Sequence, residues 1–370
     1  MKWLITSVAS LVGQNILDVL EYPGFSRRSL VNIVGMNSVP DSAGNFRCDR
    51  CYLVPLTASA QYSSRICEIL YEESPDLILC GRDEDTLALS RLKREHPDLP
   101  GALPCADPRA ALIGIDKWQT WLFSRRHRLP FGESFMVGEP GIDADLETFC
   151  RRVGYPLIAK PVRGFASRGV CFVRHAADAQ SIARQGDFLF QEYLGDPQEL
   201  EPYFAGLQGP IPLFACAPNT GHYSCQTMIA PNGQITPVFI SHHSHEYGQT
   251  LRNRRVSDSA LAELTEAYAH AFVVEGGAGP LNLGFRRDRE GRWKVQEINL
   301  RHTGNTFARL LLDFDELYYS VRDFVPGAIF PEFASGKSER FSRMNKYPYT
   351  YAIPDSAVAA LENSGVWSRF

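Results

Sequence analysis

The sequence lacks the features that mark secreted, membrane and nucleic-acid-binding proteins. Nine cysteines in 370 residues are too few for a disulfide scaffold, so we expect reduced thiols and a cytoplasmic protein. The formal net charge of −4 gives no overall basic field, which argues against nucleic acid as a partner. No apolar run reaches transmembrane length, and Gln14, Asn15 and Asp18 interrupt the apolar start of the chain. We therefore expect neither a signal peptide nor a membrane partner.

Motifs for zinc and for dinucleotides are missing as well. The CxxC motif Cys48–Cys51 has no second CxxC or HxxxH at zinc-finger spacing, so a loop that happens to carry two thiols is favoured over a metal or redox site. The first strand-to-helix turn, Thr6–Asn15, contains Gly13 as its one glycine. It therefore lacks the GxGxxG fingerprint, which makes an NAD site a weak hypothesis.

The first hundred residues alternate strand-like and helix-like patterns. Such alternation predicts a parallel sheet with helical crossovers. The chain is long enough for two or three domains, and 44% hydrophobic and 22% charged residues are typical of a globular protein. The expected strands are Lys2–Thr6, Leu30–Gly35, Cys51–Val54 and Leu77–Cys80, and the expected helices are Gln14–Glu21, Ser59–Glu73 and Glu84–Glu95.

The rest of the chain mixes helices with hairpins. Asn232-Gly233 is a typical hairpin turn and predicts pairing of His222–Ala230 with Gln234–Ser241. The tail from Phe330 onward fits no clear element. Further expected helices are Trp118–Arg128, Asp145–Val153 and Asp258–Glu275, and further expected strands are Tyr155–Pro161, Gly169–Val173, Phe188–Tyr193, Leu281–Arg287 and Trp293–Ile298.

A carboxylate, an amide and a guanidinium alternate along the strand that leads to Gly304. Side chains two residues apart point to the same face of a strand, so Glu297, Asn299 and Arg301 are expected to lie together. Carboxylate and amide oxygens suit Mg²⁺, and Arg suits a phosphate or a developing anion. By themselves these residues fit a metal site and a solvated strand face equally well.

A lysine and two glycines mark a second motif, Lys160–Gly169. Lys160 leaves an expected strand, and a loop of small residues between Gly164 and Gly169 leads into the next one. Such a loop can place its N–H groups around phosphates, with the lysine as a point charge. An ordinary β-hairpin with a flexible turn is the alternative. GxxxxGK[ST] is absent, so this is not a Walker loop.

The order of these motifs resembles the ATP-grasp superfamily, on the branch of carbamoyl-phosphate-synthetase-like and pyrrolysine-ligase-like carboxylate–amine ligases. The resemblance covers roughly Lys2 to Phe324. It implies an ATP-grasp fold preceded by a Rossmann-like pre-ATP-grasp domain with a parallel sheet. The motifs in chain order are Asp116-Lys117, Lys160–Gly169, Phe190–Leu194, Gly279–Asn282 and Glu297–Arg301. The expected parts are residues 1–110 (pre-ATP-grasp domain), 111–190 (N-terminal subdomain with the lid loop), 191–330 (C-terminal subdomain with the metal site) and 331–370 (C-terminal extension).

The resemblance also implies roles for particular residues. Lys117 and Lys160 correspond to the basic residues that contact the phosphates of ATP, and Arg301 stabilises the acyl-phosphate beside Lys160. Glu297 and Asn299 correspond to the ligands of Mg²⁺, for which Mn²⁺ is an alternative. The remaining implied residues are Gly164, Ser167, Arg168 and Gly169 in the lid over the phosphates, and Gln191, Glu192, Tyr193 and Leu194 in the hinge against adenine.

Two positions depart from the pattern of the superfamily. Gly284 stands where many relatives carry a first metal ligand, and Asn282 on the same face is a candidate substitute. The carboxylate that holds the ribose is either Glu199 or absent, because His222 stands where a glutamate is usual.

Two further segments can each be interpreted in two ways. His242–Arg255, with three histidines and three arginines on an expected loop, meets phosphates and acceptor substrate in such a family, or is a solvated loop. It lacks the spacing of a zinc site. Asp83–Asp85 is expected to start a helix, where the dipole favours acidic residues, and a substrate role is the lesser alternative.

The function implied is an ATP-dependent ligase that joins a small carboxylate to a small amine through an acyl-phosphate and releases ADP. One of the two substrates is expected to be an amino acid, and the protein is expected to form a homodimer. The alternatives are an ATP-binding scaffold or sensor with impaired catalysis, motivated by Gly284, and a kinase or carboxylase on the same fold.

Overall fold

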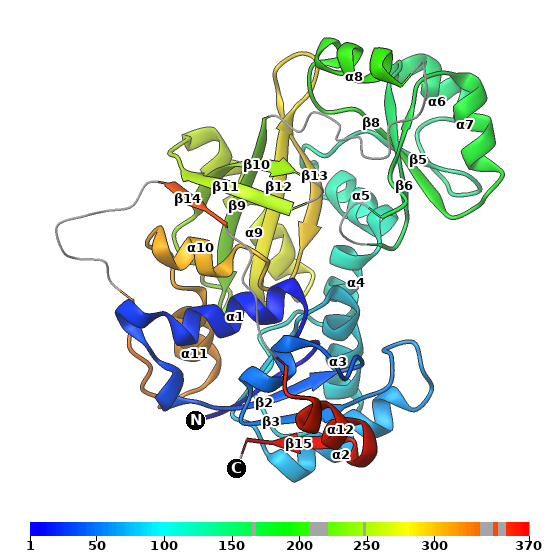
Figure 1. Ribbon diagram of the computed structural model, residues 1–370. Coiled ribbons are helices and arrows are strands. Elements are labelled where there is room, and N and C mark those ends of the chain that lie inside the picture. The colour runs from blue at the N-terminus through cyan, green and yellow to red at the C-terminus, as the bar shows by residue number, and fades with distance from the viewer. Residues whose placement is uncertain (165–167, 208–220, 247–248, 334–342, 347–352, 370) are drawn as a thin grey trace.

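Three β-sheets organise the chain (Figure 1). The computed structural model describes residues 1–164, 168–207, 221–246, 249–333, 343–346 and 353–369. In Figure 1 the first sheet lies at the bottom, a small sheet at the upper right, and the largest sheet on the left above the first one. Within the part of the chain so described, no helix is long and apolar enough to cross a membrane.

The first sheet is parallel, as the sequence predicts. Its order is β15-β3-β2-β1-β4, and β1 to β4 run parallel. Apolar side chains on both faces are buried, as is typical of strands covered by helices on each side. The elements are β1 (Lys2–Ile5), β2 (Asn32–Asn37), β3 (Arg50–Leu53), β4 (Leu77–Leu79), α1 (Leu11–Glu21), α2 (Tyr62–Glu73) and α3 (Asp83–Glu95).

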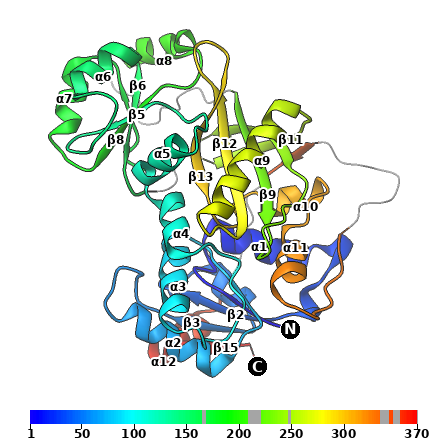
Figure 2. The same ribbon diagram turned by 180° about the vertical axis from the view of Figure 1, so that it is seen from behind.

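The small sheet is antiparallel, with the order β5-β8-β6-β7. Helices α4 and α5 lead to it from the first sheet, as the view from behind shows (Figure 2). Its core is formed by apolar residues that include Phe149, Leu157 and Phe190. The elements are α4 (Pro108–Ile115), α5 (Lys117–Arg126), β5 (Ser134–Met136), α6 (Leu146–Val153), β6 (Leu157–Pro161), β7 (Cys171–Val173), α7 (Ala176–Ala183), β8 (Phe188–Glu192) and α8 (Glu201–Gly206).

The large sheet is antiparallel, with the order β13-β12-β9-β10-β11-β14. One face packs against α9 and α5 in the largest apolar core. The other face is rich in polar side chains, which belong to the site described below. The elements are β9 (His222–Ile229), β10 (Phe239–Glu246), β11 (Gln249–Arg255), α9 (Ser259–Val274), β12 (Gly279–Arg287), β13 (Trp293–Asn299), α10 (Thr306–Leu311) and α11 (Glu316–Phe324).

The tail joins two of the sheets. β14 (Arg343–Asn345) pairs with β11 of the large sheet, and β15 (Val366–Ser368) pairs antiparallel with β3 of the first sheet. Helix α12 (Asp355–Ser364) packs beside β3 through Leu361. Sequence patterns missed β14 and β15 because each has three residues, too few for a period to be visible.

One expectation from the sequence is wrong. The expected loop over His242–Arg255 is the hairpin of β10 and β11, in which His243 and Asn253 are buried and paired while Arg252 and Arg254 are exposed. The arginines occupy the outer side of an alternating strand, which composition alone does not reveal. The regular strand β13 ends at Asn299, one residue beyond the predicted Ile298, and Arg301 follows it with its guanidinium 3.3 Å from Asn299 Oδ1.

The N-terminal part is fastened to α11 by a buried ion pair. Arg27 Nη1 lies 2.6 Å from Asp315 Oδ2, and the two side chains are 1% and 2% exposed. The guanidinium also lies over the Phe330 ring, at 4.5 Å from its centroid. Asp315 caps α11 by accepting from the Tyr318 N–H.

We predict that Asp315→Asn costs about 3–5 kcal/mol of unfolding free energy, because it leaves the Arg27 charge buried without a counter-charge. Asparagine can still cap the helix through its side-chain oxygen, so the loss reports the contacts of Asp315 Oδ2, which are the ion pair with Arg27 and the hydrogen bond from the Phe333 N–H. Denaturant unfolding of the variant and the unaltered protein measures this loss of free energy. Glu147→Gln, which removes the exposed pair with Arg151, is the control and should cost less than about 1 kcal/mol. Equal losses in the two variants would contradict the prediction.

Candidate active site

A lysine of the small sheet reaches the last strand pair of the large sheet. Lys160 leaves β6 on the face opposite to Leu157 and Ala159, which are buried in the core of the small sheet. Its Nζ donates to Gln191 Oε1 at 2.7 Å and lies 3.4 Å from the carbonyl oxygen of Gln296. Since Gln296 precedes Glu297, the structure brings the predicted phosphate lysine to the predicted metal strand.

Lys117 lies at the base of the predicted lid. It is the first residue of α5, whose cap Asp116 accepts from two N–H groups of the first turn. Its Nζ donates to the carbonyl oxygen of Gly164 at 3.1 Å, and its own N–H bonds to the carbonyl of Val162. The helix start therefore fixes Lys117 beside the loop that follows β6.

Burial weakens the charged form of both lysines, and neighbouring cations add to this effect at Lys160. Desolvation lowers the pKa of Lys160 to about 8, Glu297 opposes that shift, and Lys117 and Arg286 add to it. Desolvation also lowers the pKa of Lys117, with Glu297 and Asp83 acting in the opposite sense. An anion with several charges would relieve this crowding, so the cluster is suited to a polyphosphate.

The predicted lid residues lie at the surface. Gly164, Arg168 and Gly169 are exposed, and Ser167 falls outside the described residues. Gly169 has φ +72°, and a β-carbon there would lie 3.0 Å from Pro161 Cγ. This backbone conformation accounts for a glycine at the end of the loop.

The predicted hinge is held largely by its own side chains. Gln191 is buried between Lys160 and Ser134, and Glu192 accepts from the Glu133 N–H at 2.8 Å and pairs with Lys294. The Glu192 carboxylate is therefore occupied by contacts within the protein.

The end of the hinge meets a buried arginine that sequence reasoning missed. Tyr193 and Leu194 are buried, and the Leu194 carbonyl lies 3.5 Å from Arg286 Nη1. Burial lowers the pKa of Arg286, while Tyr193, Glu297 and Glu199 favour its charge. Glu199 itself is exposed on a short 3₁₀ turn, Pro197–Leu200. Arg286 lies two residues beyond Gly284 in β12 and therefore on the same face of the strand. This alternation is the feature from which the sequence could have identified Arg286.

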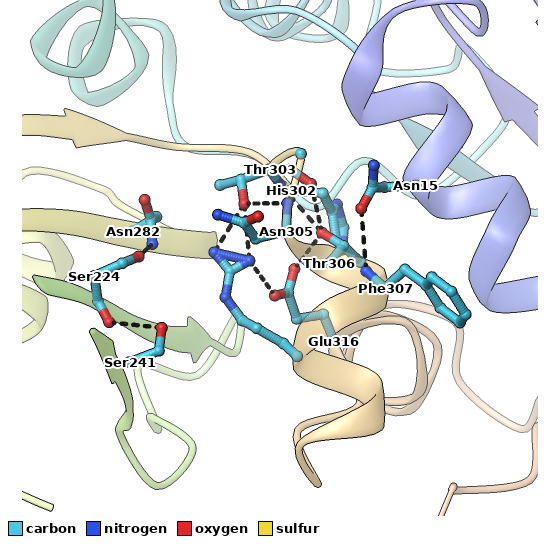
Figure 3. A network of polar contacts seen from close by, with 12 residues as sticks. Asn15, Ser224, Ser241, Asn282, His302, Thr303, Asn305, Thr306, Phe307 and Glu316 are labelled. Atoms are coloured by element: carbon cyan, nitrogen blue, oxygen red, sulfur yellow. Dashed lines mark hydrogen bonds and ion pairs between the residues drawn. The ribbon is translucent and has the colours of Figure 1, made fainter. Parts of the chain in front are cut away.

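The two predicted metal ligands of β13 lie opposite Gly284 and its candidate substitute Asn282 in β12. Glu297 pairs with Gly284, and Asn299 pairs with Asn282. Asn282 Nδ2 donates to Ser224 Oγ at 2.8 Å and to the Cys225 carbonyl at 3.2 Å, so its nitrogen is committed to β9 (Figure 3). The oxygens of Glu297, Asn299 and Asn282 form a hard donor set on one face, which fits Mg²⁺.

Arg301 is held beside this donor set by the N-terminal domain. Its Nη2 lies 2.6 Å from Asp83 Oδ2 and 3.3 Å from Asn299 Oδ1, and its Nη1 donates to the His302 carbonyl at 3.0 Å. Asp83 does begin α3, as predicted, with acidic residues in the first turn. Its contact with Arg301 was missed because 218 residues separate the two.

The loop after Arg301 is fixed by a buried polar network, which Figure 3 shows around Thr303, Asn305, Thr306 and Glu316. Arg309 donates to Thr303 Oγ1 with both Nη atoms at 2.8 Å and pairs with Glu316 at 2.8 Å. Asn15 of α1 accepts from the Phe307 N–H at 3.4 Å. Domain contacts thus set the position of the segment that follows the metal strand.

The two thiols of the CxxC motif lie inside the apolar core of the first sheet. Cys48 and Cys51 are buried, and burial raises the pKa of both thiols. Among the residues whose placement is described, no three His, Cys, Asp or Glu side chains gather as a metal-binding group.

Comparison with known proteins adds independent information. No family model matches the chain. A D-alanine–D-alanine ligase from Alkalilimnicola ehrlichii is 24% identical over 235 residues, which are 60% of this chain and 67% of the relative. N5-carboxyaminoimidazole synthetase from Staphylococcus aureus, solved with ADP, has a TM-score of 0.63 at 13% identity and covers 90% of this chain and 78% of its own. L-amino acid ligase from Bacillus licheniformis has a TM-score of 0.61 at 11% identity, with 88% and 74% covered.

We predict that binding of ATP, the ligand expected from the sequence, takes up protons above pH 8. Lys160 with a pKa of about 8 is partly neutral there, and phosphates beside it would raise that pKa, so the complex holds more protons than the free protein. Affinity should therefore fall as the pH rises through about 8.

Calorimetry at pH 8.5 in two buffers of different ionisation enthalpy measures this uptake, which should be a fraction of one proton, about 0.5 or more. Lys160→Arg should abolish the uptake while keeping the charge. Binding without proton exchange in the unaltered protein would contradict the assignment of Lys160 to the phosphates.

Proposed function

We propose that this chain, which belongs to the ATP-grasp superfamily, is an ATP-dependent carboxylate–amine ligase. The fold predicted from the sequence is confirmed by its likeness to ADP-forming ligases of that superfamily. The proposed enzyme joins two small molecules and releases ADP and phosphate. One substrate is proposed to be an amino acid, since two of the similar proteins are named as ligases of alanine and of L-amino acids. A cytoplasmic location and a homodimer complete the proposal.

One observation carries this proposal. Lys160 Nζ lies 3.4 Å from the carbonyl oxygen next to Glu297, and the charge of Glu297 opposes the desolvation that lowers the pKa of both Lys160 and Lys117, although the three residues come from β6, β13 and α5. A purely structural role would not require two partly buried lysines beside a candidate metal ligand, because desolvating charge is costly. A site for a metal–polyphosphate complex needs this combination.

The first chemical step is transfer of the γ-phosphoryl group. A carboxylate oxygen of the first substrate attacks the γ-phosphorus, the bond to the ADP oxygen breaks, and an acyl-phosphate forms. Lys117 and Lys160 would hold the phosphates in line by charge. Glu297, Asn299 and Asn282 would hold Mg²⁺, which supplies neutralisation of the phosphate charge.

The second step forms the amide. The amine nitrogen attacks the acyl carbon, the carbon–oxygen bond to phosphate breaks, and the amine loses a proton. Negative charge develops on the carbonyl oxygen, and Arg301 would stabilise it. Asp83 holds Arg301 beside Asn299 and thus acts as a positioning residue. The loop 164–169 would cover the site and keep water from the acyl-phosphate.

A carboxylase is the second candidate, favoured by the likeness to N5-carboxyaminoimidazole synthetase. In that case bicarbonate would replace the organic carboxylate as the group that is phosphorylated. Dependence of turnover on the acid supplied separates the two candidates.

We predict that the protein releases ADP and phosphate when given ATP, Mg²⁺, pooled amino acids and simple carboxylates. Hydroxylamine should trap the acyl-phosphate as a hydroxamate, and omission of bicarbonate should have no effect. Splitting the pool then identifies both substrates.

Glu297→Gln should lower this release at least about 100-fold, because it removes the carboxylate of the donor set. Glu290→Gln, exposed on the turn of the same hairpin, is the matched control and should leave the rate unchanged. AMP and pyrophosphate as products would contradict the acyl-phosphate mechanism. Tight ATP binding with no turnover across a broad panel of acids and amines would favour the sensor.

A further inference from the structure

The C-terminal tail brings a lysine to the loop that follows Arg301. The Lys346 N–H donates to the carbonyl oxygen of Leu251 at 2.8 Å, which extends the pairing of β14 with β11. The Lys346 ammonium donates to the carbonyl oxygen of Gly304. The tail, which lies beyond the stretch that resembles the superfamily, therefore places a cation at the loop that begins with the arginine proposed to stabilise the reacting carbonyl.

This ammonium lacks a counter-charge of its own. Within the described ranges of the chain Lys346 forms no ion pair, and Asp18, the carboxylate that acts on it, is itself paired with Arg47 at 2.7 Å. Desolvation and the charge of Arg309 lower the pKa of Lys346 to about 8, and Asp18 opposes this shift. An ammonium has three N–H donors, of which the Gly304 carbonyl takes one. The charge and two donors thus remain for an anionic ligand.

An amide without hydrogen bonds lies on the same face of the large sheet. Met344, two residues before Lys346, pairs with Asn253 of β11, so Asn253 and Lys346 belong to one face. Asn253 is 3% exposed, and neither its amide oxygen nor its amide nitrogen has a partner among the described residues. Buried amide atoms of this kind are unfavourable unless a ligand or water supplies the hydrogen bonds.

The loop that holds the ammonium also supplies a free acceptor. Asn305 follows Gly304 directly and is 9% exposed. Its Nδ2 donates to Thr250 Oγ1 at 3.3 Å, whereas its Oδ1 has no partner in the part of the chain that the structure describes. A cation and an acceptor held at neighbouring loop positions match an α-amino acid, which carries its carboxylate and its amine on one carbon atom.

We propose that Lys346 binds the carboxylate of the amine substrate, so that this substrate is an α-amino acid whose own carboxylate stays free. Asn305 Oδ1 accepts from the amine, and Asn253 Nδ2 is a second donor to the carboxylate. An ammonium–carboxylate contact is a charge-assisted hydrogen bond and is stronger than a neutral one. The inference rests on the proposed function, because the amine substrate is that of the proposed ligase.

Competition between amino acids and their amides tests this inference. The whole protein is given ATP, Mg²⁺, simple carboxylates, pooled amino acids and an equal concentration of the same amino acids as α-amides. An amide lacks the α-carboxylate, so it competes for the amine site without offering a partner to Lys346. Mass spectrometry should show that products ending in a carboxylate exceed those ending in an amide at least about tenfold, which is the effect of one charged hydrogen bond.

Variants at two cations of the tail assign this preference to one side chain. Lys346→Met removes the charge but keeps the length of the side chain, and it should lower the product ratio about tenfold or more. Lys346→Arg retains the charge and should keep most of the preference. Arg343→Met is the matched control: Arg343 pairs with Arg254 on the opposite face of β14, and loss of this exposed cation should leave the ratio unchanged.

Hydroxylamine separates failure of this inference from failure of the proposed function. Lys346→Met should still form the hydroxamate, because the first step does not involve the amine. A product ratio near one in the unaltered protein would overturn the inference, and so would a ratio that Lys346→Met leaves unchanged. Hydroxamate without any carboxylate-terminated product would also overturn it and leave the ligase proposal standing. Absence of both hydroxamate and amide products would overturn the two together.

Discussion

The placement of the Lys160 amine against the strand that carries Glu297 is the contact on which the rest of the site depends. It joins the small sheet to the large one through Gln191 and the Gln296 carbonyl. Burying this cation beside Lys117 and Arg286 is unfavourable, as the lowered pKa of Lys160 reflects, and Glu297 compensates for part of that cost. The arrangement is therefore poised for a ligand that brings negative charge together with a metal.

The surrounding architecture holds this site from three sides. Asp83 of α3 holds Arg301, Asn15 of α1 holds the start of α10, and Lys346 of the tail donates to the carbonyl of Gly304 in the loop between them. Because the tail also adds strands to the first and the large sheets, the reacting groups are fixed by contacts between distant segments. Such support from several elements is what a site that aligns two substrates and a phosphate requires.

The parts of the fold that could be predicted from the sequence are those with a visible period. Strand-like segments between helix-like ones indicated β1 to β4, and two such segments around a turn indicated the hairpin of β12 and β13. The alternation of side chains predicted that Glu297 and Asn299 lie on one face. Long-range pairing left no such trace, so the contact of Asp83 with Arg301, the role of Arg286 beside the hinge and the approach of Lys346 to Gly304 required the structure. The β10–β11 hairpin was mistaken for a loop because its arginines and histidines mask the alternation of buried positions.

The central claim is that Lys160 and Glu297 act on one bound ATP–metal complex, and a double-mutant cycle tests it most directly. Dissociation constants of ATP with Mg²⁺ would be measured for the unaltered protein, Lys160→Met, Glu297→Gln and the double variant. We predict a coupling energy of at least about 1 kcal/mol, because each residue acts on the same ligand. Losses that add within about 0.3 kcal/mol would mean that the two residues serve separate sites and would contradict the account.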